Sequence, residues 1–175
     1  DGGKYEWGTT VSKAYLPVEH NEFFTEGLTL LEWLRQFVPP HVTDADEPFL
    51  RGFLGKMLFS GDDIGKKTNV LSGGEKVRCM ISRMMLQNPN VLILDEPTAV
   101  LSAREAIILF AKIRELAKRG TTVIYISHRI EEIFEISDRV LVLKDGVGVL
   151  DSTTKALDHD SLVHAMVGRS LAAIY

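Results

Sequence analysis

Two short runs of branched aliphatic residues, separated by an amphipathic stretch, restrict this chain to a small set of folds. The runs are Val91–Leu94 and Thr122–Ile126, and their β-branched residues are typical of strands buried on both faces of a parallel sheet. Between them, Ala103–Lys118 repeats apolar residues at helical spacing, and Gly120 follows as a residue favoured just after a helix. The predicted buried side of this helix carries Ile107, Phe110, Ile113 and Leu116 or Ala117. Strand, helix and strand in this order form a βαβ unit, so we predict an α/β fold with a parallel sheet core.

Upstream of this unit the sequence predicts a group of helices. Apolar residues recur at helical spacing within residues 28–37 and again within residues 49–58. The stretch Pro39–Pro48, rich in prolines and acids, divides them and is predicted to be a loop. Within one domain of 175 residues, we expect a helical subdomain from about residue 28 to 86, followed by an α/β part from about residue 87 to 175.

Downstream of the unit we expect one more strand and a last helix. Val140–Leu143 is a third run of branched aliphatic residues, and we predict that it lies in the same parallel sheet. Lys144–Gly146 has the composition of a turn. A short helix is expected to start near Asp160 or Ser161.

Composition and charge argue against several classes of protein. The formal net charge of −4 gives no bulk electrostatic reason to bind nucleic acid, so we expect no direct DNA binding. Cys79 is the only cysteine, which excludes an internal disulfide and favours a reducing compartment. No apolar run approaches the roughly 20 residues that a membrane-spanning helix needs. We therefore expect a cytoplasmic protein that is, at most, peripheral at the inner face of the membrane.

A carboxylate pair, Asp95-Glu96, directly follows the first aliphatic run. Ligands of open parallel sheets collect at the carboxyl ends of the strands. There an aspartate can hold a magnesium ion, and an adjacent glutamate can direct a water molecule at a phosphate. Acids are common at strand ends, so the pair alone is weak evidence. It makes Asp95 a candidate metal ligand and Glu96 a candidate catalytic residue.

The second candidate site is the sequence LSGGE, Leu71–Glu75, which precedes a helical pattern. Ser72 and Glu75 have the spacing of a capping box, an ordinary way to begin a helix. Backbone N–H groups at Gly73 and Gly74, at the positive end of the helix, would also suit a terminal phosphate. Both interpretations can hold together, so these four residues are candidate nucleotide-binding residues.

The third candidate is His128, which follows Ser127 at the end of the second aliphatic run. A histidine that faces the same crevice as Glu96 could bond a γ-phosphate or orient the attacking water. A single histidine is more often structural, and it is the position after the next strand that favours a catalytic role.

The spacing of the three motifs is more specific than any one of them. Asp95 lies 23 residues after Ser72, and His128 lies 32 residues after Glu96. With these motifs in this order, the chain resembles the ATP-binding cassette (ABC) ATPases from at least Val70 onward. The resemblance implies a P-loop NTPase-like fold with a helical subdomain, and ATP and Mg²⁺ as cofactors.

The same resemblance implies a role for each candidate residue. Ser72–Glu75 would be the signature, which serves the ATP held by a second ABC cassette. Asp95 would be the Walker B aspartate that handles Mg²⁺, Glu96 the general base, and His128 the switch histidine. A second cassette, as a homodimer or heterodimer partner, is therefore expected.

One departure from the family is the phosphate-holding loop. A P-loop needs G-x-x-x-x-G-K-[ST] so that backbone N–H groups can wrap the phosphates. The nearest match, around Gly65-Lys66, has Ser60 in place of the first glycine and Lys67 in place of the hydroxyl residue, and no strand is predicted before it. We therefore expect these residues to be the part of an ABC domain that follows its Walker A segment.

A second departure is that the resemblance changes along the chain. The first half, through the signature helix, is similar to the second cassette of ABC-F proteins, soluble tandem ATPases of which many act on ribosomes. The part after the Walker B motif is similar to the first cassette of sugar-import ABC ATPases. The Asn-His-Leu-Asp D-loop of ABC-F proteins is replaced by Ala99–Ser102, so its aspartate role does not carry over to Ser102.

Three hypotheses about function follow from the resemblance. The first is an ABC ATPase component that binds and hydrolyses ATP at a composite dimer site and is coupled, through membrane permease subunits, to import of a sugar or similar solute. The second is an ABC-F type ATPase associated with the ribosome, which the first half favours. The third is a non-catalytic remnant or recombined cassette, which the missing Walker A segment favours.

Overall fold

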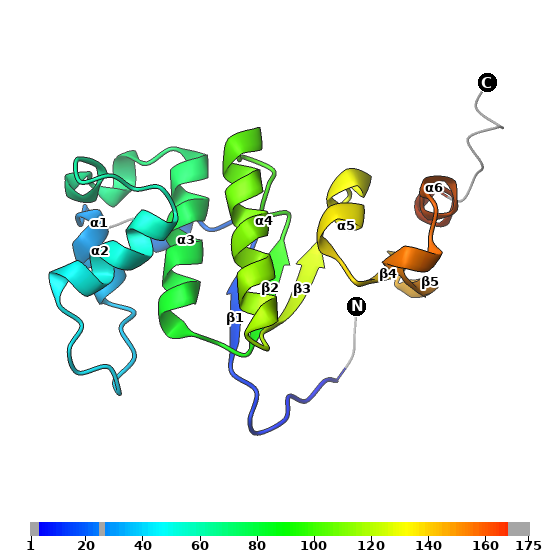
Figure 1. Cartoon of the computed structure of the whole chain (residues 1–175), viewed down its shortest axis with the longest axis horizontal. Helices are drawn as coiled ribbons and strands as arrows, with labels where there is room; N and C mark the ends of the chain where they lie inside the picture. Colours follow the sequence, from blue (N-terminus) through cyan, green and yellow to red (C-terminus); the bar gives the residue numbers. More distant parts are fainter. Residues whose placement is uncertain (1–3, 25–26, 168–175) are drawn as a thin grey trace. The chain divides into compact units, whose positions relative to one another are not determined.

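The computed structural model describes residues 4–24 and 27–167 and divides the chain into two compact units, Asp1–Ile126 and Ser127–Tyr175 (Figure 1). The first unit contains β1 (Lys13–Leu16), α1 (Leu30–Arg35), α2 (Glu47–Lys56), α3 (Gly73–Gln87), β2 (Val91–Asp95), α4 (Ala103–Lys118) and β3 (Thr122–Ile126). The second unit contains α5 (Ile130–Ile136), β4 (Arg139–Lys144), β5 (Val147–Thr153) and α6 (His159–Val167). Short 3-10 turns are η1 (Asn21–Phe24), η2 (Asp63–Gly65), η3 (Thr68–Val70) and η4 (Thr154–Ala156).

A parallel sheet in the order β1-β2-β3 forms the centre of the first unit. β2 and β3, with α4 between them in the chain, make the predicted βαβ unit. Their pairing runs from Val91 opposite Thr122 to Asp95 opposite Ile126. Gly120, with φ of +94°, ends the α4 connection as predicted. The α/β fold class is confirmed.

β1 is a strand that the sequence does not predict. Only two of its four side chains, Ala14 and Leu16, are buried, so its local pattern is weak. Asn90, just before β2, fixes the start of β1 through its side chain. Its Oδ1 accepts the Ser12 N–H at 2.9 Å, and its Nδ2 donates to the Thr10 carbonyl at 2.8 Å. A contact between residues 78 positions apart therefore places this strand.

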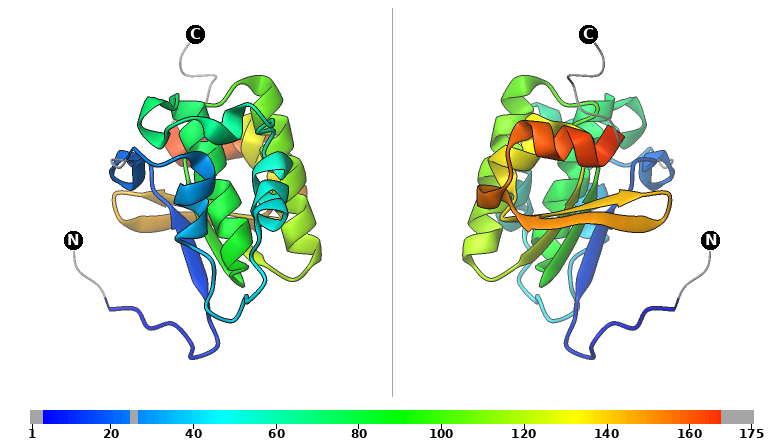
Figure 2. Two further views of the ribbon diagram at one scale, coloured as in Figure 1. Left: turned by 90° about the vertical axis from the view of Figure 1, so that its left-hand side faces the viewer. Right: turned by 90° about the vertical axis from the view of Figure 1, so that its right-hand side faces the viewer.

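α3 and α4 lie side by side and pack on the sheet (Figure 2). Apolar side chains of both helices meet those of β2, namely Ile81, Met84, Met85, Leu92, Leu94, Leu109, Ile113 and Leu116. The buried side predicted for α4 is partly wrong, because Ile107 is 65% exposed while Leu109 is buried. Phe110 lies at the edge of the buried stripe of α4. The centroid of its ring is 6.2 Å from that of Tyr125 in β3. Ile107, three residues before Phe110, lies beyond that edge.

The other side of the sheet is open at its edge strands. Tyr15 of β1 and Ile124 and Ile126 of β3 are 42–50% exposed. The prediction that the strands are buried on both faces is therefore wrong for β3. The reason is that α3 and α4, the helices of the first unit that contact the sheet, cover one set of alternating side chains.

The second unit is built on an antiparallel hairpin of β4 and β5. The prediction that Val140–Leu143 joins the parallel sheet is therefore wrong. β4 buries only alternate residues, Val140 and Val142, against Leu162 of α6, as a strand covered on one face does. Positive φ at Asp145 and Gly146 confirms the predicted turn and closes the hairpin.

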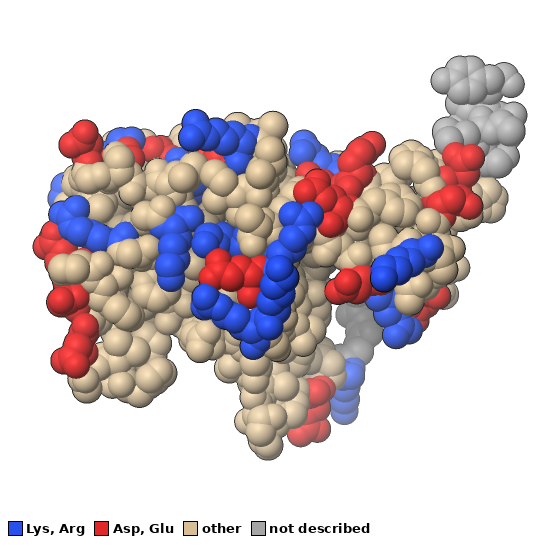
Figure 3. Space-filling view, in the orientation of Figure 1, with Lys and Arg blue, Asp and Glu red and all other residues tan. Residues whose placement is uncertain are grey.

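Acidic and basic side chains alternate over the first unit on the face shown in Figure 3. Glu115 of α4 illustrates the mixing, since it pairs with the Lys112 ammonium at 2.8 Å and the Arg119 guanidinium at 2.6 Å. On that face the charges do not form the single-sign stripe that is typical of nucleic-acid binding.

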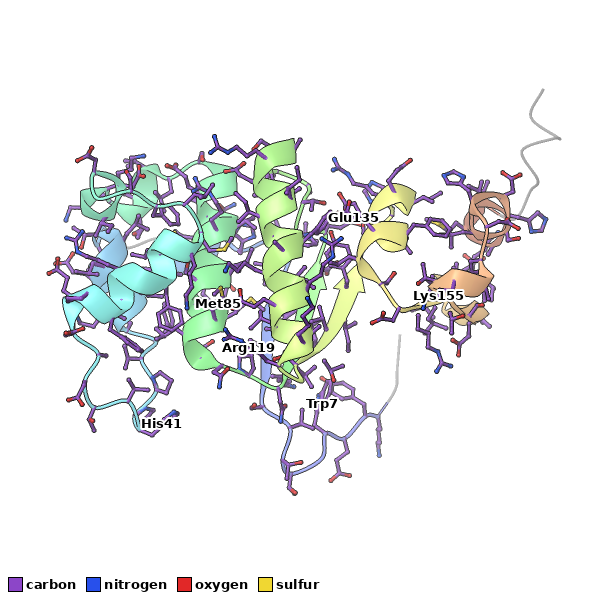
Figure 4. The ribbon with its side chains drawn as sticks, viewed as in Figure 1. Trp7, His41, Met85, Arg119, Glu135 and Lys155 are labelled. Atoms are coloured by element: carbon purple, nitrogen blue, oxygen red, sulfur yellow. The ribbon has the colours of Figure 1, made fainter. Side chains whose placement is uncertain are left out.

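α1 and α2 confirm the two predicted helices; α1 is shorter than its apolar stripe, and α2 begins two residues before its stripe and ends two residues before the end of it. Both begin at capped residues: Thr29 accepts the N–H of Glu32, and Asp46 accepts the N–H of Phe49. The loop between them carries His41 (Figure 4) and lies within the predicted Pro39–Pro48 loop apart from its first residues. Among the described residues, no helix is long and apolar enough to cross a membrane.

Candidate functional site

The start of α3 has the predicted capping box. Ser72 is the N-cap in extended backbone, and its Oγ accepts the Glu75 N–H at 3.3 Å. In return, the Ser72 N–H donates to Glu75 Oε2 at 2.8 Å. Ser72 and Gly73 are exposed, whereas Gly74 is buried, so only the first residues of this 15-residue helix are open to solvent. The capping interpretation is confirmed, and the phosphate-binding interpretation remains a prediction.

The two glycines of this turn have a packing role that the sequence does not reveal. The loop after β2 passes close to them at Val100. A Cβ at Gly74 would lie 3.2 Å from the Val100 carbonyl oxygen, and one at Gly73 would lie 3.4 Å from Val100 Cβ. A side chain at Gly74 would therefore displace backbone, which explains a glycine in the first turn of a helix without reference to a ligand.

An ion pair fixes the start of α4 against α3. Arg78 Nε of α3 lies 3.0 Å from Glu105 Oε1 of α4, and both side chains are largely buried. Glu105 also closes a capping box, since its Oε2 accepts the Ser102 N–H at 2.8 Å. Arg78 Nη1 donates to the Met57 carbonyl at the end of α2 at 2.9 Å. One arginine thus joins three helices beneath the exposed turn of α3.

The carboxylate pair lies at the carboxyl end of β2, as predicted. Asp95 is the last residue of the strand, and its Oδ2 accepts the Tyr15 hydroxyl of β1 at 3.1 Å. Glu96 has φ of +46°, a left-handed conformation that is uncommon for a residue other than glycine. Its N–H still donates to the Ile126 carbonyl of β3 at 3.0 Å, so the backbone turns away directly after the last bond of the sheet. Such strain at a strand end is typical of functional sites.

A single loop connects the two candidate sites of the first unit. It begins at Glu96, turns through the Ala99 N–H bond to the Glu96 carbonyl at 3.1 Å, and reaches α3 at Val100. Ser102 ends the loop as the N-cap of α4. The carboxylate pair and the exposed turn of α3 are therefore held by one short segment.

The Gly65-Lys66 segment, which resembles a P-loop in part, does not have the structural context of a P-loop. It follows α2 and a turn, not a strand, and ends the 3-10 turn η2. Lys66 Nζ lies 2.7 Å from Asp63 Oδ1 and 2.9 Å from Glu75 Oε1. Hydrogen bonds to Asp63, and then to Glu75, raise the pKa of the Lys66 ammonium. Sequence reasoning gave Lys66 no role, yet it contacts the signature glutamate.

Burial and hydrogen bonding act in opposite directions on Glu75. Partial burial favours the protonated acid and would raise its pKa. The hydrogen bonds from the Ser72 backbone and the Lys66 ammonium together outweigh burial, so the pKa of Glu75 lies below its usual value. At neutral pH the carboxylate is therefore charged.

His128 belongs to the second unit, not to the unit that holds the carboxylate pair. It lies in the turn before α5, where it is exposed. The neighbouring Ser127 Oγ accepts the Arg129 N–H at 3.0 Å, and Arg129 Nη1 pairs with the buried Glu132 at 3.2 Å. This small polar cluster fixes the backbone on both sides of the histidine.

Comparison with known proteins shows which family this part of the chain is similar to. Residues 14–99, from β1 to the loop after β2, match the family model described as ABC transporter. The whole chain is 43% identical, over 178 aligned residues, to "Uncharacterized ABC transporter ATP-binding protein YkpA" of Bacillus subtilis, and covers 31% of that protein.

Two further relatives are named as sugar importers. "Ribose import ATP-binding protein RbsA 2" of Rubrobacter xylanophilus is 44% identical over 66% of this chain and 22% of its own length. "Arabinose import ATP-binding protein AraG" of Escherichia coli is 46% identical over 66% of this chain and 23% of its own length. The chain thus spans about a third or less of the length of the curated relatives it matches.

Solved structures of ABC cassettes have the same fold. "Dimeric structure of a post-hydrolysis state of the ATP-binding cassette MJ0796 bound to ADP and Pi" aligns with a TM-score of 0.69 and 22% identity, over 85% of this chain and 65% of that one. "Dimeric Structure of MJ0796, a Bacterial ABC Transporter Cassette" aligns with a TM-score of 0.65 and 21% identity, over 79% of this chain and 62% of that one.

The packing of Gly74 gives a stability prediction. We expect Gly74→Ala to lower the free energy of unfolding by about 1–3 kcal/mol, because its Cβ would press on the Val100 carbonyl, as overpacking does. Urea unfolding followed by circular dichroism measures this difference. The matched control is Gly55→Ala in α2, where a Cβ meets nothing within 4 Å. That substitution should raise stability by roughly 0.5–1 kcal/mol. Equal stabilisation at both positions would contradict the packing role.

Proposed function

We propose that the chain, whose residues 14–99 match the family model described as ABC transporter, is part of an ABC ATPase that binds and hydrolyses ATP at a composite site formed with a second cassette, and that hydrolysis is coupled to import of a sugar or similar solute. The observation that carries this proposal is the loop Glu96–Ser102. It holds the carboxylate pair at the end of β2 and packs against the exposed first turn of α3, so both sets of polar groups are fixed in one unit.

The signature turn supplies hydrogen-bond donors. Ser72 and Gly73, at the N-terminus of α3, are exposed, and the helix dipole there favours an anion. In the proposed site backbone N–H groups of this turn and the Ser72 hydroxyl bind the terminal phosphate of the nucleotide that a second cassette holds. Preorganised donors of this kind stabilise the charge that develops during phosphoryl transfer.

The carboxylate pair supplies the metal ligand and the base. Magnesium in nucleotide sites is held by one or two carboxylates together with phosphate oxygens and water, so a single Asp95 at a strand end fits this ion. When bound, the ion neutralises charge on the phosphates. Glu96, with its backbone turned away from the strand, orients and deprotonates the attacking water in this proposal. His128, exposed in the turn before α5, is proposed as the switch histidine on the resemblance alone.

A second cassette is proposed because, by the resemblance to ABC ATPases, the signature turn Ser72–Glu75 serves the ATP held by the opposite cassette of a pair. Binding of phosphates needs a cradle of N–H groups and a lysine, which the motif G-x-x-x-x-G-K-[ST] provides. Both MJ0796 cassette structures are described as dimeric, which supports the same arrangement here.

Mixing with a second cassette tests the composite site. We expect the chain to restore ATP hydrolysis to a cassette that has an intact P-loop but a disabled signature. Ser72→Arg should abolish this rescue, because the arginine would fill the phosphate position. Gly61→Arg is the control, since it adds the same side chain to an exposed turn of the same unit with open space around it. Rescue that survives Ser72→Arg would count against the composite site.

The proposed role of Glu96 as the general base is tested in a chain to which a P-loop segment is supplied, either by covalent fusion or as a separate partner protein. There we expect Glu96→Gln to reduce turnover by roughly 10²–10⁴-fold, because general-base assistance contributes about that factor. Nucleotide binding, measured by fluorescence of a labelled analogue, should remain. Turnover near the wild-type rate with bound nucleotide would remove Glu96 from the catalytic role.

The solute is proposed from the two relatives named for ribose and arabinose import. We expect the chain to co-purify with membrane permease subunits from gently solubilised cells. Co-purification with ribosomes would instead support the ABC-F alternative, which the first half of the sequence favours.

A further inference from the structure

The signature turn contains a charge that opposes its proposed ligand. Glu75 closes the capping box from the first turn of α3, where its carboxylate accepts the Ser72 N–H at 2.8 Å. A carboxylate stabilises the N-terminus of a helix. A phosphate that approaches the same turn meets this negative charge, and like charges disfavour each other at short range. The capping box that forms the signature turn therefore also disfavours binding of a phosphate there.

Lys66 lies against this carboxylate. Its Nζ is 2.9 Å from Glu75 Oε1, on the oxygen that the Ser72 N–H does not use. The backbone holds Lys66 in place, since its carbonyl accepts the Leu30 N–H at 3.1 Å and its N–H donates to the Asp63 carbonyl at 2.9 Å. The side chains of Glu75 and Lys66 are 18% and 44% exposed, so water screens the pair in part.

We propose that Lys66 is a positioning residue that neutralises the Glu75 carboxylate and so allows the signature turn to accept a phosphate of ATP. This inference rests on the proposed function. Lys66 acts through Glu75 and does not itself bind the nucleotide, because two of the three N–H groups of its ammonium already donate to Asp63 and Glu75.

A charge-pair mechanism makes a specific prediction for paired substitutions. Lys66→Met leaves Glu75 uncompensated, so phosphate binding weakens. Glu75→Gln keeps the capping box, because glutamine also serves at this position. In the double variant the capping-box carboxylate that opposes the phosphate is gone, so loss of Lys66 no longer matters at the signature turn; Asp63, the other partner of Lys66, keeps its hydrogen bonds from Ser60.

The experiment measures ATP-dependent association between this chain and the cassette with an intact P-loop and a disabled signature. We expect Lys66→Met to raise the ATP concentration at half-maximal association by about tenfold. Lys66→Arg, which keeps the charge, should stay near wild type. Lys67→Met is the matched control, since it removes the adjacent lysine, and it should change the value by less than about twofold. The double variant Lys66→Met with Glu75→Gln should match Glu75→Gln alone.

Each result decides between this inference and its rivals. If the double variant stays as weak as Lys66→Met, Lys66 contacts phosphate directly and the inference is overturned. An equal loss in Lys67→Met would point to general basic charge and overturn it as well. Unchanged association in Lys66→Met would overturn the inference alone. A wild-type chain that shows no ATP-dependent association would overturn the proposed composite site, and the inference with it. Hydrogen exchange at the Ser72 amide would reveal a variant that has lost the capping box itself.

Discussion

The close approach of one loop to one helix end determines the geometry of the candidate site. Val100 lies so near the first turn of α3 that a Cβ at Gly74 would be 3.2 Å from its carbonyl oxygen. Because the loop begins at Glu96, this packing also fixes how the backbone leaves β2. The positive φ of Glu96 and the packing of Val100 on Gly74 thus lie in one short segment. A glycine pair that a motif search assigns to ligand binding thus has a structural reason as well.

Capping glutamates in this chain have a second use. Glu75 and Glu105 each close a capping box at the third helical position, and each also pairs with a basic residue of a different segment, Lys66 and Arg78. A local device for starting a helix thereby becomes a tertiary contact. The two pairs fix the turn after η2, the start of α3 and the start of α4 to one another.

Local and repeated patterns were predictable from the sequence, and contacts between distant segments were not. The βαβ unit, α4 with its end near Gly120, and the Ser72–Glu75 box are encoded within a few residues and are confirmed. The sheet that Val140–Leu143 joins was predicted wrongly, because a run of branched residues does not show whether one face of the strand or both faces will be covered. The contact of Lys66 with Glu75 has no local signal, since no motif joins positions nine residues apart across two turns. The catalytic roles of Glu96 and His128 remain predictions.

The pairing of β1 has a consequence for the order in which the chain is made. Ser12 and Thr10 leave the ribosome well before Asn90, the residue whose side chain fixes them beside β2. During synthesis β1 therefore has no strand partner until almost 80 further residues have emerged, and loops of that length close slowly. Tyr15 meets Asp95 only after that, so the carboxyl end of β2 acquires its hydroxyl partner late. Of the three described strands of this sheet, β1 is therefore made before the others and has no strand partner until β2 is made.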